Sequence, residues 1–515
     1  MKDSPNNEQT FINFLFYNRR NRIVLCLAAI AVVIQFIVFK YQFPFANFLY
    51  DDSFQYLEDA TSNPVISIHP VGYARFLRLI SIFTYSDTIL AATQYLLLQA
   101  SGLFLLFTLF YFHKLGKWLQ YSLIIFIVIN PLFLQLANLV SRDAFFASLS
   151  MSWLALMLWI IHKPSTKNII WHTLVVFIAF TVRYQAIIYL FIAVMAFILS
   201  NIPLRKKLAG ASAGILLCAL LFCYQGFQFK KIAGHWQPAP LFGWLLANNA
   251  IYMYKHIPYN ERKLVDIQYK ALDKTVRRYL NSTMNVKFYP WEINEADDVY
   301  LWQLNSPLLK YADTSFKRVN DSLASQQKKW ATMANYYEAY GIYLIRKYPV
   351  QYLSYYAGQG AKKYFFPPVE YLEIYNNGVM NIPDRAKNWF RYKSNKIMFR
   401  GGNNIAPFIS LYSYLNSIMN TIFLFGLLYY FILKGWQQYK TFHKTLLFTG
   451  SLWITHALFT ILLTTSALRL NIFPLILSTI MTLTLVDWML EFIKQANPEG
   501  KGKAGYKPNH IQVIA

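Results

Sequence analysis

The sequence has few acidic residues and almost no cysteine. It carries 24 Asp and Glu against 49 Lys and Arg, so its formal net charge is +25 over 515 residues. The three cysteines, at positions 26, 218 and 223, lie inside apolar runs, which argues against a disulfide framework or a cysteine metal site. Charged residues make up only 14% of the chain, well below the usual share in a soluble protein. Water is therefore not the solvent for most of it.

What the chain has instead is long hydrophobic runs. Hydrophobic residues account for 56% of it, and whole stretches offer about 20 apolar residues, enough for a helix to cross a hydrocarbon core roughly 30 Å thick. We predict an all-α polytopic membrane protein with ten spanning helices, at 23–43, 88–112, 121–138, 144–161, 169–182, 185–200, 208–228, 406–433, 445–464 and 470–490. The first run is long and lacks a small-residue cleavage site, so we expect it to stay in the membrane.

The positive charge is concentrated in short loops between the apolar runs. Four alternate loops hold ten Lys or Arg and no Asp or Glu: Lys114 and Lys117; Lys163 and Lys167; Arg205, Lys206 and Lys207; Lys434, Lys440 and Lys444. This is the pattern of the positive-inside rule and not of nucleic-acid binding, so we expect membrane lipid as a partner and no nucleic acid. The rule predicts that both termini are cytoplasmic in a multi-pass protein of the cell membrane, the inner membrane in a bacterium.

The predicted spans divide the chain into five parts. They are a cytoplasmic tail (1–22), a transmembrane core (23–228) with a first outer loop (44–87), an extracytoplasmic helical domain (229–405), C-terminal transmembrane helices (406–490) and a disordered, Gly- and Lys-rich cytoplasmic tail (491–515).

One amphipathic helix stands out in segment 229–405. Its apolar side chains recur at three- and four-residue steps, at Trp330, Met333, Tyr337, Tyr340 and Leu344. A second helix is expected from 350 to about 364, where Pro367-Pro368 stops it. The stripe either packs the domain onto the membrane core or forms a surface that guides a lipid or an acceptor.

A small acidic cluster follows the first predicted span. It reads Tyr50-Asp51-Asp52-Ser53-Phe54-Gln55-Tyr56-Leu57-Glu58-Asp59. Carboxylates beside a membrane are costly, so Asp51 and Asp52 are candidates for accepting a proton or for holding a divalent cation. The alternative is that both merely cap a short helix that begins at Phe54.

Other unusual polar residues fall on the same predicted outer face. His69 lies in the turn His69-Pro70-Val71-Gly72-Tyr73, and Asp143 is well placed to cap the span that follows it. Arg183 and Arg469 stand at the outer ends of apolar runs, where snorkelling to the interface explains either one. Two arginines at the depth of three aspartates also suggest a bound anion, and phosphate is the anion that Arg binds best.

Taken in order, these motifs resemble a known family. They are Asp52-Ser53-x-x-Tyr56-Leu57, then His69-Pro70-x-Gly72-Tyr73, then Ser141-x-Asp143 before a span, and then the Arg183-Tyr184 break between two spans. The pattern is similar to the polytopic glycosyltransferases of the GT-C fold, in the branch of the protein O-mannosyltransferases and the lipid A aminoarabinose transferase. The resemblance covers residues 20 to about 200 and returns at Arg346-Lys347-Tyr348-Pro349-Val350-Gln351-Tyr352 and at Arg469-Leu470-Asn471-x-x-Pro474.

The resemblance implies an inverting transfer of sugar from a polyprenyl-phosphate donor to a lipid, glycan or protein acceptor. It assigns catalysis to Asp52, Asp51 and Asp143, and substrate binding to His69, Tyr56, Arg183 and Arg469. No cofactor is certain, although Asp51, Asp52 and Asp143 are compatible with a divalent cation, Mg²⁺ or Mn²⁺. Val71 and Ala74 replace prolines that the family often has, and Leu470 replaces a common tyrosine, so the subfamily stays open.

Two other functions remain in view. A surface-polysaccharide polymerase or ligase also has many spans and one long outer segment, but it would depend on Arg and His there, and segment 229–405 has only His235 and His256. A lipid-linked glycan flippase or transporter would place ionisable residues in mid-membrane. The predicted spans are nearly free of acids.

Overall fold

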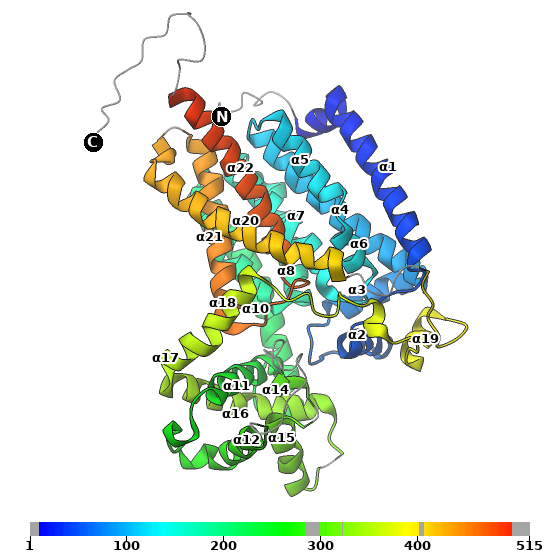
Figure 1. Cartoon of the computed structure of the whole chain (residues 1–515), viewed down its shortest axis with the longest axis vertical. Coiled ribbons are helices and arrows are strands. Elements are labelled where there is room, and N and C mark those ends of the chain that lie inside the picture. The colour runs from blue at the N-terminus through cyan, green and yellow to red at the C-terminus, as the bar shows by residue number, and fades with distance from the viewer. Residues whose placement is uncertain are drawn as a thin grey trace, which may run out of the picture.

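The protein is all-helical, as predicted. A computed structural model describes residues 10–283, 299–303, 305–321, 323–400, 406–437 and 439–496. Within those ranges there is no β-strand, and only two isolated bridges occur, Asn47 with Leu139 and Asn381 with Lys396. Figure 1 shows a bundle of long helices with a smaller helical unit at one end.

In the described part of the chain, eight helical segments are long and apolar enough to cross a membrane, and two shorter apolar helices complete the bundle. The helices that form these ten segments are α1 (Arg19–Gln42), α4 (Asp87–Phe112), α5 (Lys117–Val128) with α6 (Pro131–Asn138), α7 (Arg142–His162), α8 (Thr166–Val182), α9 (Ile187–Leu199), α10 (Leu204–Ala233), α20 (Ala406–Ile432), α21 (Lys440–Leu463) and α22 (Ile472–Ala496).

The ten segments correspond one to one to the predicted spans. The third span is not one continuous helix: it breaks at Asn130-Pro131, because proline has no N–H to donate and Asn130 caps the new helix by accepting from Leu132 N. The fifth and sixth are the shorter pair, α8 and α9, and they meet at Arg183 and the turn η2 (Tyr184–Ala186).

The surface of the bundle is suited to lipid. On α1, Leu27 and Ile37 are about 60% exposed. Only 17% of the most apolar stretch of α1 is buried inside the protein, whereas 78% of the most apolar stretch of the central helix α7 is buried. Apolar side chains on that scale cannot face water at an acceptable cost, and helices satisfy their own backbone hydrogen bonds in hydrocarbon. The chain is an integral membrane protein.

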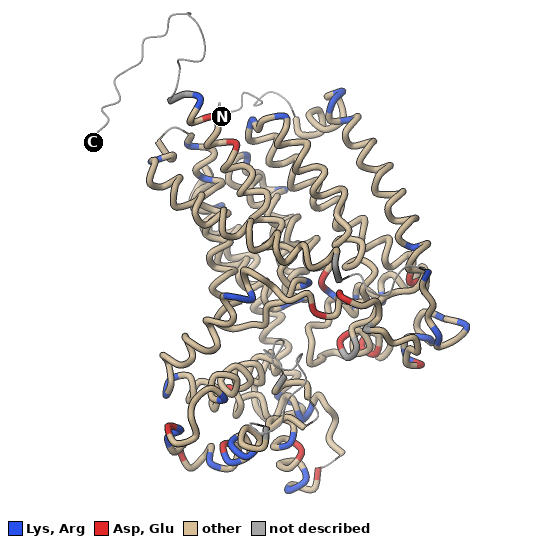
Figure 2. The backbone as a smooth tube through the Cα atoms, in the orientation of Figure 1, with Lys and Arg blue, Asp and Glu red and all other residues tan. Residues whose placement is uncertain are grey.

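Both ends of the bundle are well defined. In Figure 1, α1 begins and α22 ends at the upper end of the bundle, and the helical unit sits at the lower end. Figure 2 shows that charged residues are sparse along the bundle and gather at its ends and on that unit. The first and last spanning helices thus begin and end at the same end of the bundle, as the charge pattern predicts.

The helical unit has a core of its own. It consists of α11 (Pro240–Lys255), α12 (Lys270–Thr283), α14 (Val299–Trp302), α15 (Pro307–Arg318) and α16 (Gln326–Lys347). The predicted amphipathic helix is α16, and all five stripe residues are buried. These side chains pack inside the helical unit and not onto the membrane core, which was one of the two predicted roles. Trp330 stacks on Trp244 of α11 with ring centroids 4.1 Å apart, Tyr337 donates to Leu308 O at 2.6 Å, and Tyr340 donates to Asp273 Oδ1 at 3.0 Å.

The described residues of segment 229–405 contribute to two different hydrophobic cores. The last part of the segment, from 366 to 400, packs with the bundle core and the first outer loop instead of the helical unit. There, α19 (Asp384–Phe390) contacts α2 (Tyr50–Ser62), Asn376 N donates to Asn47 Oδ1 at 2.8 Å, and Arg385 pairs with Glu58. Proline at 367 and 368 ends the preceding helical run as predicted, at Phe365.

The remaining helices are short. All of them connect longer elements except α3, which lies in the first outer loop. They are η1 (Asn13–Tyr17), α3 (Gly72–Ser81), η3 (Tyr259–Glu261), η4 (Ile267–Tyr269), α17 (Pro349–Gln351), η5 (Tyr352–Ala357), α18 (Gly358–Phe365), η6 (Tyr375–Gly378) and η7 (Gly435–Gln437).

The topology predicts opposite accessibility for the two ends. In a variant without Cys26, Cys218 and Cys223, we expect Thr314→Cys on α15 to react with a membrane-impermeant maleimide in intact cells. Thr166→Cys, also exposed but at the other end of the bundle, should react only after the membrane is opened. Labelling of both positions from the same side would contradict the topology, and labelling of only Thr166→Cys in intact cells would invert it.

Candidate functional site

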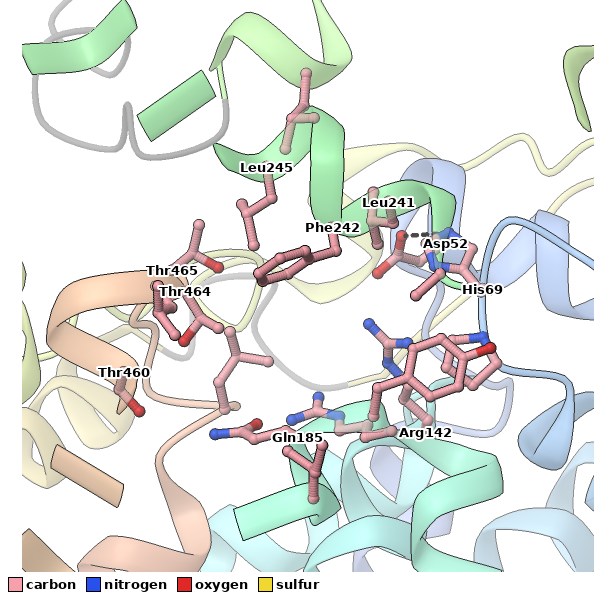
Figure 3. A pocket seen from close by; sticks show the side chains of 18 of the residues that line it. Asp52, His69, Arg142, Gln185, Leu241, Phe242, Leu245, Thr460, Thr464 and Thr465 are labelled. Atoms are coloured by element: carbon pink, nitrogen blue, oxygen red, sulfur yellow. Dashed lines mark ion pairs between the residues drawn. The ribbon is translucent and has the colours of Figure 1, made fainter. Parts of the chain in front are cut away.

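A large cavity lies where the spanning helices end beneath the helical unit. Its volume is about 940 Å³, and we call it the helix-end cavity. Figure 3 shows Asp52 and His69 on one side, Thr460, Thr464 and Thr465 on the other, and Leu241, Phe242 and Leu245 of α11 above them. Arg142 and Gln185 lie below. Much of the remaining wall is apolar, including Phe180, Phe222 and Leu463.

Asp52 stands on the first turn of α2, which begins at Tyr50. The predicted cap is not made by an aspartate. Leu49 is the N-cap residue, and Ser53 Oγ accepts from Leu49 N at 2.8 Å and donates to Val140 O at 2.7 Å. A parallel bridge between Asn47 and Leu139 fixes the same junction. The first outer loop is thereby held against the start of α7.

His69 is brought to Asp52 by the turn before α3. Its Nε2 lies 3.8 Å from Asp52 Oδ1. The turn sits tightly on α8 because residue 72 is glycine: a Cβ there would lie 2.6 Å from the Thr181 carbonyl oxygen. Burial lowers the pKa of His69 to about 4, against an opposing effect from Asp52 and a reinforcing one from Arg142. At neutral pH the ring is uncharged, and its Nδ1 has no hydrogen-bond partner among the described residues.

Asp143 lies behind the cavity wall between two arginines. Its Oδ1 pairs with Arg183 Nη2, and its Oδ2 accepts from Arg469 Nη1 at 3.2 Å. The carboxylate itself is fully buried, and both guanidiniums reach the cavity. Ser141, not Asp143, is the N-cap of α7 and accepts from Asp143 N at 3.3 Å. We call this group of three charges the Asp143 triad.

Arg142 is the guanidinium that the sequence reasoning missed. It lines the helix-end cavity from the first position of α7, and it forms no ion pair or hydrogen bond with any described residue. A cation at a helix N-terminus is unfavourable with respect to the helix dipole, and the nearest ring, Tyr56, is 5.9 Å away. Helix N–H groups and a cation without a counter-charge together favour an anionic ligand.

Two further wall residues have strained backbones. Glu370 and Tyr371 have φ angles of +31° and +50°, a region that residues with side chains adopt at a cost. Tyr371 lies with its ring 5.8 Å from the Arg469 guanidinium carbon. Both residues face the cavity from the segment that follows Pro367-Pro368. Backbone strain here is consistent with a segment whose conformation is set by its position in the cavity wall.

The predicted site residues thus converge, with two placed one layer deeper. Asp52, His69, Arg183 and Arg469 all line the helix-end cavity. Tyr56 and Asp143, predicted to contact substrate or to act in catalysis, are buried behind it, at 1% and 2% exposed. The Tyr56 ring lies against Tyr73 and His69, and burial raises the pKa of its hydroxyl well above the usual value. The Asp51 side chain lies outside the described residues.

The cation site predicted from three aspartates stays a prediction, because the Asp51 side chain lies outside the described residues. In the described part of the chain, no three His, Cys, Asp or Glu side chains lie close enough to hold a metal ion. Asp143 is already engaged by two guanidiniums, so its oxygens are not available as ligands.

A scan against protein-family models, a search of curated proteins and a search of solved structures found no match to this chain. The site is therefore interpreted from its own geometry.

The Asp143 triad predicts a large stability difference between two similar substitutions. Asp143→Asn removes the carboxylate that pairs with both Arg183 and Arg469, and breaking a buried ion pair typically costs about 3–5 kcal/mol. Asp52→Asn removes a carboxylate that is 25% exposed and only 3.8 Å from a neutral ring, so we expect a change within about 1 kcal/mol. Thermal unfolding in detergent compares them. Equal melting temperatures for the two variants would contradict the triad's structural role.

The buried His69 predicts a pH effect. Because its pKa in the folded protein is below the value of about 6.5 in an unfolded chain, the folded state resists protonation. The stabilising contribution is complete above about pH 6.5 and is lost as the pH falls toward 4. Between pH 7 and pH 5 the wild type should lose roughly 2 kcal/mol more stability than His69→Gln. An equal fall in melting temperature from pH 7 to pH 5 in both proteins would show that His69 is not buried in its uncharged form.

Proposed function

We propose that this chain is an integral-membrane inverting glycosyltransferase that uses a polyprenyl-phosphate-linked sugar. The observation that carries the proposal is the composition of the helix-end cavity. A carboxylate with a neutral imidazole stands on one side, guanidiniums stand below, and the rest of the wall is largely apolar. A lipid phosphate sugar has the matching parts, which are an apolar tail, an anion and a polar ring.

The arginines would hold the carrier phosphate. Arg142 forms no ion pair or hydrogen bond with a described residue, and Arg469 keeps 14% of its side chain exposed, so these two are the better placed. Arg183 is 7% exposed and would act mainly by fixing the Asp143 triad. Cations fixed beforehand in a poorly solvated site stabilise the leaving phosphate as it gains charge, without reorganisation at the moment of reaction. This role needs no metal ion.

Asp52 would act on the acceptor. Its carboxylate takes the proton of the acceptor hydroxyl, and the acceptor oxygen attacks the anomeric carbon from the face opposite the phosphate. The bond between that carbon and the phosphate oxygen breaks, and the polyprenyl phosphate leaves with the electron pair. His69 is uncharged at neutral pH, and it either orients the Asp52 carboxylate or relays a proton to it.

We further propose that the cavity faces away from the cytoplasm, in the inner membrane of a bacterium. The four basic loops lie at the end of the bundle opposite the cavity, which the positive-inside rule places in the cytoplasm. The acceptor would then be a lipid, glycan or protein outside the cytoplasm.

The residues that line the cavity also argue against the two alternative functions, a polymerase or ligase and a flippase. A polymerase or ligase that used the histidines of the long segment would require them in the cavity, but neither His235 nor His256 lines it. His235 Nε2 lies 3.1 Å from Ala331 O, and His256 stacks on Tyr355. A flippase would need ionisable groups along a path through the bundle, and the carboxylate and guanidiniums of the cavity cluster at one end.

Asp52→Asn tests the proposal because it keeps size and hydrogen-bonding capacity while removing the charge. Incubating membranes that contain the protein and its acceptors with a panel of polyprenyl-phosphate sugars should transfer the sugar to an acceptor and release free polyprenyl phosphate. In the variant we expect turnover to fall by at least roughly 100-fold with donor binding preserved, since a positioned base contributes about 100- to 10,000-fold. Asp313→Asn, on exposed α15, is the matched control and should turn over normally.

Near wild-type transfer by a folded Asp52→Asn variant would refute the catalytic assignment. Failure of the wild type to release polyprenyl phosphate from any donor in the panel would refute the glycosyltransferase proposal as a whole.

A further inference from the structure

A second hollow lies on the outside of the first outer loop, away from the helix-end cavity. Its volume is about 690 Å³, and it runs between α2, α3 and α19. Three arginines line it, Arg78, Arg385 and Arg391, together with the rings of Tyr85 and Trp389. Glu58 is the single carboxylate in its wall, so the lining has a positive excess. We call it the Arg391 groove.

The side chains of the groove are arranged for an anion. Glu58 neutralises Arg385, and Arg78 donates one hydrogen bond to Ala60 O at 3.2 Å. Arg391 has no hydrogen bond or ion pair with any described residue. Its guanidinium carbon lies 4.1 Å from the centre of the Tyr85 ring, which itself packs edge-on against Trp389 at 5.7 Å. Stacking on a ring holds the guanidinium flat while its N–H groups stay available.

The backbone at Arg391 supports a role for this side chain. It is the C-cap residue of α19 and has a φ of +55°, in the left-handed region. Helices usually end with glycine or asparagine in that conformation, because a larger side chain is disfavoured there. Arg391 adopts it nonetheless, in the position that sets its guanidinium over Tyr85.

The groove lies at the level of the membrane surface. Tyr85 is two residues before α4, a spanning helix that begins at Asp87. Just before Tyr85, Ile82 and Phe83 are 72% and 84% exposed, although both are large and apolar. Apolar side chains next to the start of a span are covered by the boundary between headgroups and acyl chains.

A basic segment continues from the groove along this level. Residues 385–400 contain six Lys or Arg and no Asp or Glu: Arg385, Lys387, Arg391, Lys393, Lys396 and Arg400. At its far end Arg400 N donates to Gln42 O at 2.9 Å, where the spanning helix α1 ends, and its guanidinium carbon lies 4.5 Å from the Tyr41 ring. The positive charge therefore follows the ends of α1 and α4 (Figure 2).

We propose that the Arg391 groove binds the phosphate headgroup of an anionic membrane phospholipid. The phosphate accepts hydrogen bonds from Arg391 and Arg78, the polar headgroup lies against Trp389, and the acyl chains run past Ile82 and Phe83 into the bilayer. A soluble acidic glycan would use the arginines equally well, but it would leave the exposed Ile82 and Phe83 unexplained. This site is independent of the proposed transfer reaction and would anchor the first outer loop at a fixed depth.

Native mass spectrometry of the full chain in detergent tests the site. We would titrate the protein with phosphatidylglycerol or phosphatidylcholine and compare the wild type with Arg78→Gln/Arg391→Gln. Each arginine near a lipid surface contributes about 1 kcal/mol, so the double variant should bind the first phosphatidylglycerol roughly 30-fold more weakly. Arg278→Gln, an exposed arginine on α12 of the helical unit, is the matched control. Arg391→Lys keeps the charge and should retain most of the binding.

The outcomes separate the alternatives. Preference for phosphatidylglycerol in the wild type and the control, lost in the folded double variant, supports the site. Unchanged binding by the double variant would overturn it, as would equal binding of the two lipids. If glycerol phosphate, which has no acyl chains, competes as strongly as phosphatidylglycerol, the groove is a site for soluble anions and the lipid proposal fails. Melting temperature and size-exclusion profile establish that each variant is folded.

Discussion

The buried carboxylate of Asp143 is the interaction on which the site depends. It joins three parts of the chain that are far apart in sequence: the start of α7, the break between α8 and α9 at Arg183, and the turn between α21 and α22 at Arg469. Burying a guanidinium without a partner would cost several kcal/mol, and one carboxylate here partners two. The triad therefore fixes the relative positions of these helix ends and leaves one positive charge in excess.

That excess charge, with Arg142 at the N-terminus of α7, sets the chemistry of the helix-end cavity. An anion bound there would lower the net positive charge of the group without breaking any protein ion pair. Asp52 and His69 stand across the cavity and are held by a separate set of contacts through Ser53 and the Gly72 turn. The anion-binding side and the proton-accepting side are thus built by different parts of the chain. The strained backbone at Glu370 and Tyr371 closes the wall beside Arg469.

The sequence predicted the bundle well, because the length and apolarity of each span are local properties. It also selected Asp52, His69, Arg183 and Arg469, because each is a polar residue at the end of an apolar run, and helix ends on one side of a membrane must lie near one level. What it could not predict depends on tertiary contacts. One such contact is the pairing of Asp143 with Arg183 and Arg469, and the catalytic role of Asp143 stays a prediction. Arg142 is the middle residue of the Ser141-x-Asp143 motif, but nothing in the motif shows that it forms no ion pair with a described residue. Glu370 and Tyr371 are more than 300 residues from Asp52 in sequence. The α16 stripe was correct as a helix face, but its partner α11 could not be read from periodicity alone.

The central claim is that the helix-end cavity recognises a phosphate carried on a prenyl chain. Equilibrium binding of a polyprenyl phosphate and of the corresponding polyprenol, which differs only by the phosphate, tests it most directly in the wild type and in Arg142→Gln. We expect the phosphate form to bind at least about tenfold more tightly to the wild type, the difference expected for one or two charge-assisted hydrogen bonds, and Arg142→Gln to remove much of this preference. Equal affinity of the wild type for the phosphate and the alcohol would contradict it.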